Sequence, residues 1–249
     1  MSAALPTVPV LHSEWIKIRS LRGTLGALIA MLVATAAIQA LASAATGQAD
    51  AGGLGEDPLL GAFYGVNFGQ IAAFAFGASA LAAEFHNGAL RTTLTSVPNR
   101  TRFYLSKTAM VGALAFLVGQ VTGLLTFVLG QAFTGRHALS LGDPGALRAV
   151  FGSGVYLTLM ALFAAGLTAV LRNAAIVLSV LIPFVVMVPF IIGQAAGGVA
   201  EFLPDQAGQL VLHLESTGRL GPWSGLGVLA LWAAAALAGG WLAVCRRDA

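Results

Sequence analysis

Charged residues and cysteine are both scarce in this sequence of 249 residues. Only 9% of the residues are charged and 57% are hydrophobic, whereas about a quarter of the residues of a soluble domain carry a charge. So few charges cannot cover a water-facing surface of this size, which excludes an ordinary soluble protein. The single cysteine, Cys245, excludes an internal disulfide framework. We therefore expect a membrane protein.

Motifs for metal, nucleotide and catalysis are also missing. The four histidines lack the spacing of zinc ligands. The glycines of 52–55 are not followed by the Lys-Ser/Thr of a phosphate-binding loop. Neither a His-Glu-x-x-His motif nor a complete nucleophile elbow occurs, because 77–80 lacks the second glycine. The net charge of +3 is too small for a nucleic-acid surface. The sequence therefore predicts no enzyme, no metal or cofactor site and no nucleic-acid partner.

Long uncharged runs are what the sequence does contain. A bilayer-spanning helix needs about 20 apolar residues, and the runs that reach this length are Gly23–Ala49, Pro58–Ala83, Thr108–Gly135, Ala149–Leu171, Asn173–Ala200 and Leu220–Cys245. They do not alternate apolar and polar residues as barrel strands do. We predict an all-α polytopic membrane protein, with 1–249 as a single transmembrane domain. Its six spans should lie at about 23–45, 59–83, 108–133, 149–171, 174–197 and 221–245.

Lysine and arginine are distributed unequally between the two sides of these spans. Ten lie on the side that holds both termini and three on the other, so the positive-inside rule places both termini in the cytoplasm. Ala42-Ser43-Ala44 resembles a signal-peptidase site, but the long apolar stretch behind a charged lead favours an uncleaved anchor. Eleven of the 13 basic residues are arginine, which is typical of high-GC bacteria. We expect a multi-pass protein of a bacterial inner (plasma) membrane.

The lead, 1–22, is predicted to be an amphipathic interfacial helix. Its apolar residues recur at helical spacing, with Trp15 among them and with Lys17 and Arg19 as basic members. Such a helix can anchor the chain at the headgroup level of an anionic membrane. It can also couple to a partner protein, and the two roles are compatible.

The loop 84–107 is the most distinctive stretch outside the spans. A turn at Asn87-Gly88 precedes a short helix, which Pro98 ends by restricting its predecessor. Leu90 and Leu94 share one side of this helix with Val97. That side suits insertion into a groove of another protein, and it suits contact with lipid equally well.

The outer segment 201–219 is too apolar for a plain linker. Phe202, Leu210 and Leu214 are among its apolar residues. It is expected to re-enter the membrane and close a pathway as an outer gate, although a helix lying on the outer surface is also compatible.

Small residues recur every four positions in the second span, at Gly61, Gly65, Gly69, Ala73 and Gly77. Such a stripe lets another helix approach closely, either of this chain, which we favour, or of a second subunit. The spans contain no charged residue, and their amide side chains are Gln39, Asn67, Gln70, Gln120, Gln131 and Gln194. No buried ion relay is therefore expected. This argues against an ion-driven transporter.

Taken together, the sequence resembles the membrane subunits of type-2 ABC exporters. The resemblance covers nearly the whole chain and rests on 13–20 in the interfacial lead and on 84–107. In that family the second stretch runs as an acidic residue, a Gly-hydrophobic turn, Arg, then Pro and basic residues. The matching positions are Glu84, Gly88, Arg91, Pro98, Arg102 and Lys107. His86-Asn87-Gly88-Ala89 differs from the Ser-Gly-Thr that is common at the turn.

This resemblance implies a permease subunit that forms the substrate pathway with a second copy or a related chain. A separate ATP-binding-cassette ATPase, which would bind the ATP and Mg, is expected to dock on the coupling loop 84–107. Glu84 and Arg91 are then expected to make polar contacts at that junction, and Leu90 and Leu94 an apolar knob. A stand-alone channel or facilitator, or a membrane scaffold without an ATPase, are the alternatives.

Overall fold

The computed structural model describes residues 13, 15–19, 21–46, 57–86, 89–96, 98–132, 138–192, 198, 200–214 and 218–246. Regular structure in these ranges is entirely helical. Five helices are long and apolar enough to cross a membrane, namely Arg22–Ala45, Val66–Phe85, Arg100–Ala132, Ala146–Leu171 and Pro222–Arg246. These helices agree with the all-helical, multi-pass membrane protein expected from the sequence.

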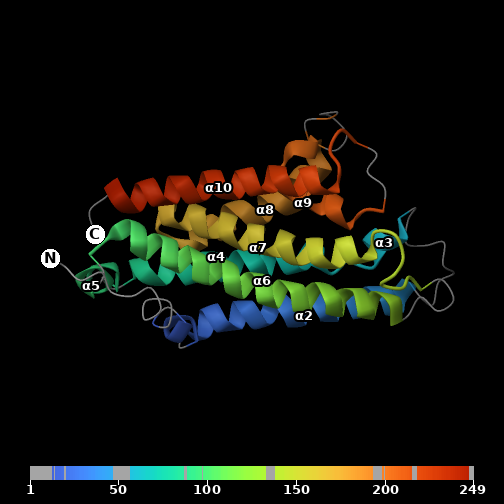
Figure 1. The fold of residues 1–249 in the computed structure, drawn as a ribbon, viewed down its shortest axis with the longest axis horizontal. Helices are drawn as coiled ribbons and strands as arrows, with labels where there is room; N and C mark the ends of the chain where they lie inside the picture. The colour runs from blue at the N-terminus through green and yellow to red at the C-terminus, as the bar shows by residue number, and fades with distance from the viewer. Residues whose placement is uncertain are drawn as a thin grey trace.

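The long helices lie side by side and form one elongated bundle (Figure 1). The elements are α2 (Arg22–Thr46), α3 (Pro58–Gly61), α4 (Val66–Ala82), η1 (Ala83–Phe85), α5 (Ala89–Ser96), α6 (Arg100–Ala132), α7 (Ala146–Leu171), α8 (Ala174–Ile192), η3 (Ala200–Phe202), α9 (Pro204–Gln209), η4 (Leu210–Leu212) and α10 (Pro222–Arg246). Figure 1 shows α5 near one end, where α2 begins and α10 ends, and α3 and α9 toward the other. We call these the α5 end and the α9 end.

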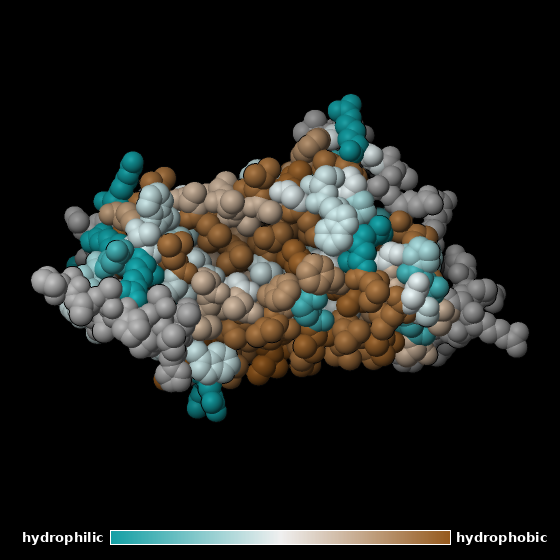
Figure 2. Space-filling model, in the orientation of Figure 1, coloured by the Kyte–Doolittle hydropathy of each residue, from teal (hydrophilic) through white to brown (hydrophobic). Residues whose placement is uncertain are grey.

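Helix α7 forms the centre of the bundle. It packs against α4, α6 and α10, and α8 contacts α4 and α7. Of its most apolar stretch, 67% is buried, against 22% for α2 at the periphery. Apolar residues cover the middle of the face seen in Figure 2, and hydrophilic residues gather toward both ends. This distribution suits a bundle that crosses a membrane along its long axis.

Helix α2 is attached along a single narrow stripe. The buried residues of this stripe recur at intervals of three or four, which is one face of an α-helix, and they are Thr24, Leu28, Met31, Thr35, Gln39 and Ser43. The other faces carry exposed apolar residues such as Ile29, Val33 and Leu41. The outer faces of α2 therefore suit lipid rather than water.

The second predicted span, expected as one helix over 59–83, is instead divided into α3 and α4 by turns at 62–65. The side chain of Gln39 in α2 bonds to this irregular backbone. Its Oε1 accepts from the Gly65 N–H at 2.9 Å, and its Nε2 donates to the Gly61 carbonyl at 3.1 Å. Irregular backbone is tolerated inside a membrane where other parts of the protein satisfy its polar groups.

The glycine stripe of this span contacts helices of the same chain. A β-carbon added at Gly69 would overlap the side chain of Thr35 in α2, and one added at Gly77 would overlap the Ala161 carbonyl of α7. Gly65 also lies against α2, at Thr35 and Gln39. The glycines therefore meet two different helices rather than one, and these contacts are intramolecular.

One further boundary differs from the prediction. Helix α6 begins at Arg100, eight residues before the predicted start at 108, because the Asn99 side chain accepts from the Arg102 N–H at 3.0 Å and caps the helix. Helix α8 runs Ala174–Ile192 and begins where the fifth span is predicted to begin; it is not among the five candidate spans, and 193–197 lie outside the described residues. The six-span count therefore stays a prediction.

Candidate functional site

A buried carboxylate lies where four segments meet at the α5 end. Glu84, in η1, is 2% exposed. Its Oε1 accepts from Lys107 Nζ at 2.7 Å and from Lys17 Nζ at 3.2 Å, and its Oε2 accepts from Thr93 Oγ1 at 3.2 Å. We call these four residues the Glu84 cluster. It joins the N-terminal helical segment 15–19, η1, α5 and α6 through one side chain.

The local structure explains how these charges come to be inside the protein. The single 3₁₀ turn of η1 ends α4 and carries Glu84 into the bundle. Lys107 lies in the early part of α6 that the charge-based span boundary had placed outside the membrane, and it is fully buried. Burying an unpaired charge is costly, whereas a paired and hydrogen-bonded one is tolerated. Each buried charge in this cluster has its opposite within bonding distance.

Lys107 and Lys17 differ in their surroundings. The side chain of Lys107 is 1% exposed, and that of Lys17 is 35% exposed. Lys17 Nζ also donates to Thr93 Oγ1 at 3.3 Å, so Lys17, Glu84 and Thr93 form a closed triangle. Lys107 is thus the interior partner of Glu84, while Lys17 joins the cluster from its edge.

Helix α5 has an inner and an outer face. Leu90 is 6% exposed and lies within the hydrophobic core, and Leu94 packs against that core. Arg91, Thr92 and Thr95 are exposed. The expected outward knob of Leu90 and Leu94 is therefore corrected, because these leucines attach α5 to its own bundle. The outer face of α5 is polar.

The expected contact of Glu84 with a partner is corrected for a similar reason. Its carboxylate is buried and is bonded within the chain. Arg91 lies on the exposed face of α5, and its contact with a partner stays a prediction. Gly88 lies outside the described residues.

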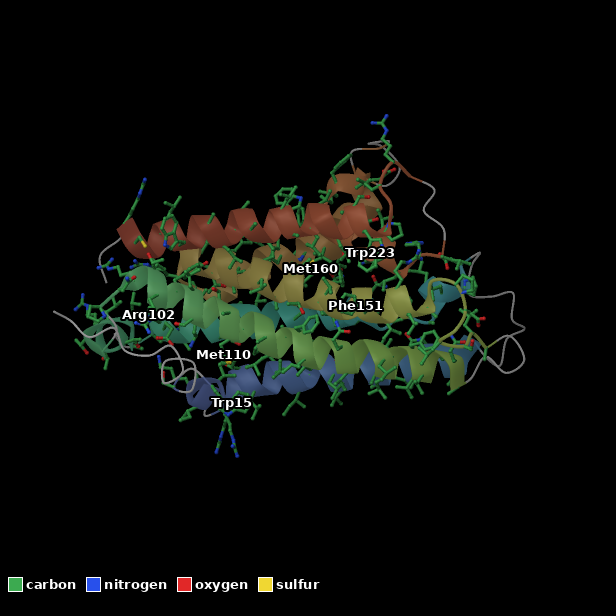
Figure 3. The ribbon with its side chains drawn as sticks, in the orientation of Figure 1. Trp15, Arg102, Met110, Phe151, Met160 and Trp223 are labelled. Atoms are coloured by element: carbon green, nitrogen blue, oxygen red, sulfur yellow. The ribbon has the colours of Figure 1, made fainter. Side chains whose placement is uncertain are left out.

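The other residues predicted at this end are near the surface. Pro98 is exposed before α6, and Arg102 is partly buried in its first turn. Trp15 and Arg19 are exposed on the N-terminal segment, whereas Ile18 is 1% exposed. Figure 3 labels Trp15 and Arg102, both toward the α5 end. The N-terminal segment therefore has an inward anchor as well as an outward amphipathic surface.

The start of α6 is also fixed to the end of α10. Arg100 Nη1 donates to the Val244 carbonyl at 3.0 Å, and Trp241 Nε1 donates to Thr101 Oγ1 at 3.0 Å. A cation near the last carbonyls of a helix stabilises its C-terminus. The first two turns of α6 are thus connected to α10 on one side and to Glu84 on the other.

A second buried polar cluster lies toward the α9 end. Asp205 of α9 is 4% exposed. Tyr156 Oη lies 2.7 Å from Asp205 Oδ1 and 2.5 Å from Gln70 Oε1, and Gln209 Nε2 donates to Asp205 Oδ1 at 2.7 Å. We call these four residues the Asp205 cluster. It joins α4, α7 and α9.

The segment predicted as an outer gate is packed onto the bundle. In α9, the buried residues are Pro204, Asp205, Ala207 and Gly208. Of the predicted gate residues, Phe202 is 44% and Leu214 is 39% exposed, and Leu210 is partly buried. The structure favours a segment folded back onto α7 and α10 over one that lies loosely on the surface.

The Glu84 cluster contains a buried ion pair that the sequence analysis did not predict, because the spans had been defined by the absence of charge. Lys107 was named only as a motif position and Asp205 was not named, because both were placed in segments outside the spans. Nothing in the sequence around either residue indicates that its side chain points into the bundle.

Neither a metal site nor a known relative adds to this description. Among the described residues, no group of three or more His, Cys, Asp or Glu could hold a metal ion. Comparison of the sequence with models of known families and with curated proteins found no match. The two polar clusters and the exposed face of α5 are the features that bear on function.

Proposed function

We propose that this chain is the membrane-spanning subunit of an ATP-binding-cassette exporter and that it forms the substrate pathway with a second membrane subunit. The observation that supports this most strongly is α5. It is a short amphipathic helix between two long apolar helices, and its polar face is exposed. Its Thr93 is bonded to Glu84 of η1, which also bonds to Lys107 and Lys17. These are the properties that a docking helix for a separate ATPase requires.

The chain lacks a nucleotide-binding motif, so ATP hydrolysis is assigned to a separate ATPase chain. In this proposal α5 lies on the cytoplasmic side. The α5 end carries most of the basic residues, as the positive-inside rule requires, and those in described positions are Lys17, Arg19, Arg22, Arg91, Arg100, Arg102, Lys107, Arg172 and Arg246.

ATP binding would close the two ATPase subunits and press on α5. Because α5 is bonded to η1 and packed on the core, it would pass that displacement into the bundle rather than move alone. The two membrane subunits would then separate toward the outer side and release substrate. Helix α8 would complete a set of six spans in each subunit.

The proposal is tested by purifying the tagged chain from its native cell in mild detergent and identifying any ATPase that travels with it. We expect a stoichiometric ATPase. Arg91→Glu should reduce its retention strongly, because it reverses a charge on the exposed face of α5. Arg246→Glu is the matched control, since Arg246 is exposed at the same end but belongs to α10.

Leu94→Asp is less suitable for this purpose, because Leu94 packs against the core and its loss would disturb the fold. A preparation without a nucleotide-binding companion, repeated under gentler extraction, would contradict the exporter and favour a stand-alone channel or a scaffold. If Arg91→Glu retained as much ATPase as the unmodified chain (the parent) does, the outer face of α5 would not be the docking surface.

A further inference from the structure

We infer that Glu84 is a positioning residue that transmits movement of α5 to α6, with Thr93 as its contact on α5 and Lys107 as its contact on α6. This inference rests on the proposed function, because it assumes that an ATPase presses on α5. It assigns to Glu84 a role inside the permease rather than at the surface that meets the ATPase.

The two oxygens of Glu84 bond to different elements. Oε1 accepts from Lys107 of α6 at 2.7 Å, and Oε2 accepts from Thr93 of α5 at 3.2 Å. The carboxylate is planar and rigid, so a displacement of Thr93 acts on the ammonium of Lys107 through only one side chain. Leu90 and Leu94 add apolar contacts between α5 and the core. Apolar contacts are non-directional, whereas a hydrogen bond weakens steeply when its geometry changes.

The Glu84–Lys107 pair is the part of this link that cannot separate easily. Both side chains are at most 3% exposed, so parting them would leave two unpaired charges in the interior. The Thr93 bond to Glu84 is weaker, since its donor is a neutral hydroxyl. While the Thr93 bond is intact, movement of α5 displaces Glu84, and Lys107 follows because the buried pair does not separate easily. From Lys107 it passes along α6, whose first turns are bonded to α10 through Arg100 and Thr101.

Lys17 gives the link a second branch. It donates to both Glu84 and Thr93, so the N-terminal segment is fastened to the same two groups. Its partial exposure lets water replace these bonds at smaller cost than at Lys107. The N-terminal segment is thus expected to support α5 rather than to transmit the main displacement.

Helix α5 offers a matched pair of variants. Thr93→Val removes the hydroxyl that bonds to Glu84 and leaves the buried ion pair intact. Thr95→Val makes the same chemical change on the same helix, but the Thr95 hydroxyl is exposed and donates only to the Thr92 carbonyl at 2.7 Å. A difference between the two variants therefore reports the bond to Glu84 and not helix propensity or side-chain polarity.

The experiment uses the complex of the chain with the ATPase that copurifies with it. Cys245 is the only cysteine of this chain, so Cys245→Ala removes its thiols, and the chain is labelled before the ATPase is added back. An environment-sensitive fluorophore is attached at Leu141→Cys or, separately, at Leu147→Cys. Both side chains are exposed at the α9 end, 41% and 64% respectively. The measurements are the ATP-induced fluorescence change and the affinity of the ATPase for the membrane subunit.

We expect Thr93→Val to bind the ATPase with the parent's affinity. Its ATP-induced shift in the conformational equilibrium should be about three- to tenfold smaller, as the loss of one hydrogen bond predicts. Thr95 lies on the proposed docking face, so Thr95→Val is compared at saturating ATPase, where its ATP-induced shift should equal that of the unmodified chain. A purely structural role of Thr93 would instead change thermal stability and leave the ATP response of the folded complex unaltered.

The possible results distinguish failure of the inference about Glu84 from failure of the proposed function. A full ATP response in Thr93→Val, or an equal loss in Thr95→Val, would overturn the role of Glu84 alone. Absence of an ATPase from the parent complex, or a parent in which neither reporter responds to ATP, would overturn the proposed function and the link together.

Discussion

The two ends of the bundle hold their connecting segments by different means. At the α5 end, two ammonium groups and a hydroxyl converge on Glu84. At the α9 end, the carboxylate of Asp205 is bonded to neutral groups, namely one phenol and two amides, from Tyr156, Gln209 and Gln206. The first cluster depends on the balance of charge, and the second depends on shape and hydrogen bonding.

Packing of the backbone sharpens this contrast. In the α9 segment, a β-carbon at Gly208 would press on the ring of Tyr156, and one at Gly225 of α10 would overlap the Ala207 carbonyl. Backbone and ring are therefore in direct contact along this segment. At the α5 end, by comparison, long side chains bridge the elements. Changes of charge should damage the α5 end most, and changes of volume the α9 end.

The largest effect is expected for Lys107→Met, which keeps the volume and removes the charge. It leaves Glu84 buried without its interior partner, and breaking a buried pair in this way costs about 3–5 kcal/mol of unfolding free energy. The measurement is the unfolding temperature of the purified chain in a fixed detergent.

A double variant provides the control for this prediction. Adding Glu84→Gln to Lys107→Met removes both buried charges, and replacing a whole buried pair is often close to neutral. Most of the lost stability should return. A double variant as unstable as Lys107→Met would show that packing, and not charge balance, governs the α5 end.

A smaller effect is expected for Gly208→Ala, which tests volume at the α9 end. The added methyl group must displace Tyr156 or Leu229, and overpacking of this kind costs about 1–3 kcal/mol. Gly227→Ala is the control, because Gly227 lies in α10 with no atom within 4 Å of the added carbon. It should be neutral or slightly stabilising. Equal unfolding temperatures for the two variants would contradict close packing of α9 against Tyr156 and Leu229.

The smallest effect is expected for Tyr156→Phe, which deletes one hydroxyl from the Asp205 cluster. Asp205 keeps its bonds to Gln209 and Gln206, so the loss should be about 1 kcal/mol. Tyr64→Phe, at a tyrosine that is 46% exposed, serves as the comparison in the same thermal assay. A loss as large as that of Lys107→Met would mean that the two ends do not differ in the way proposed.

Much of the fold could be predicted because a membrane imposes simple rules on sequence. Long uncharged runs gave the positions of the apolar helices to within a few residues at most boundaries, as for Ala146–Leu171. The break at 62–65 could not be predicted, since it depends on an amide that α2 supplies from 26 positions earlier. The early start of α6 was missed because Arg100, Arg102 and Lys107 were assumed to lie in water.

The candidate site was predictable only in part. The position and amphipathic character of α5 follow from Leu90, Arg91 and Leu94 in the sequence. Which face turns inward does not follow, because i, i+4 spacing is the same for an inner and an outer face. The partners of Glu84 and Asp205 come from distant elements, and only the packing of the bundle brings them together.

The bond between Gln39 and the backbone at 61–65 has a consequence for how α2 is oriented. Apolar side chains meet lipid and other apolar side chains on nearly equal terms, so they hardly resist rotation of a peripheral helix about its axis. The Gln39 amide does resist it, because it must face Gly61 and Gly65 to bond to them. One residue of slip along α2 would turn it by about 100 degrees and carry it out of reach. Together with the close contacts of Thr35 with Gly65 and Gly69, this uncharged side chain fixes the rotational register of the first span.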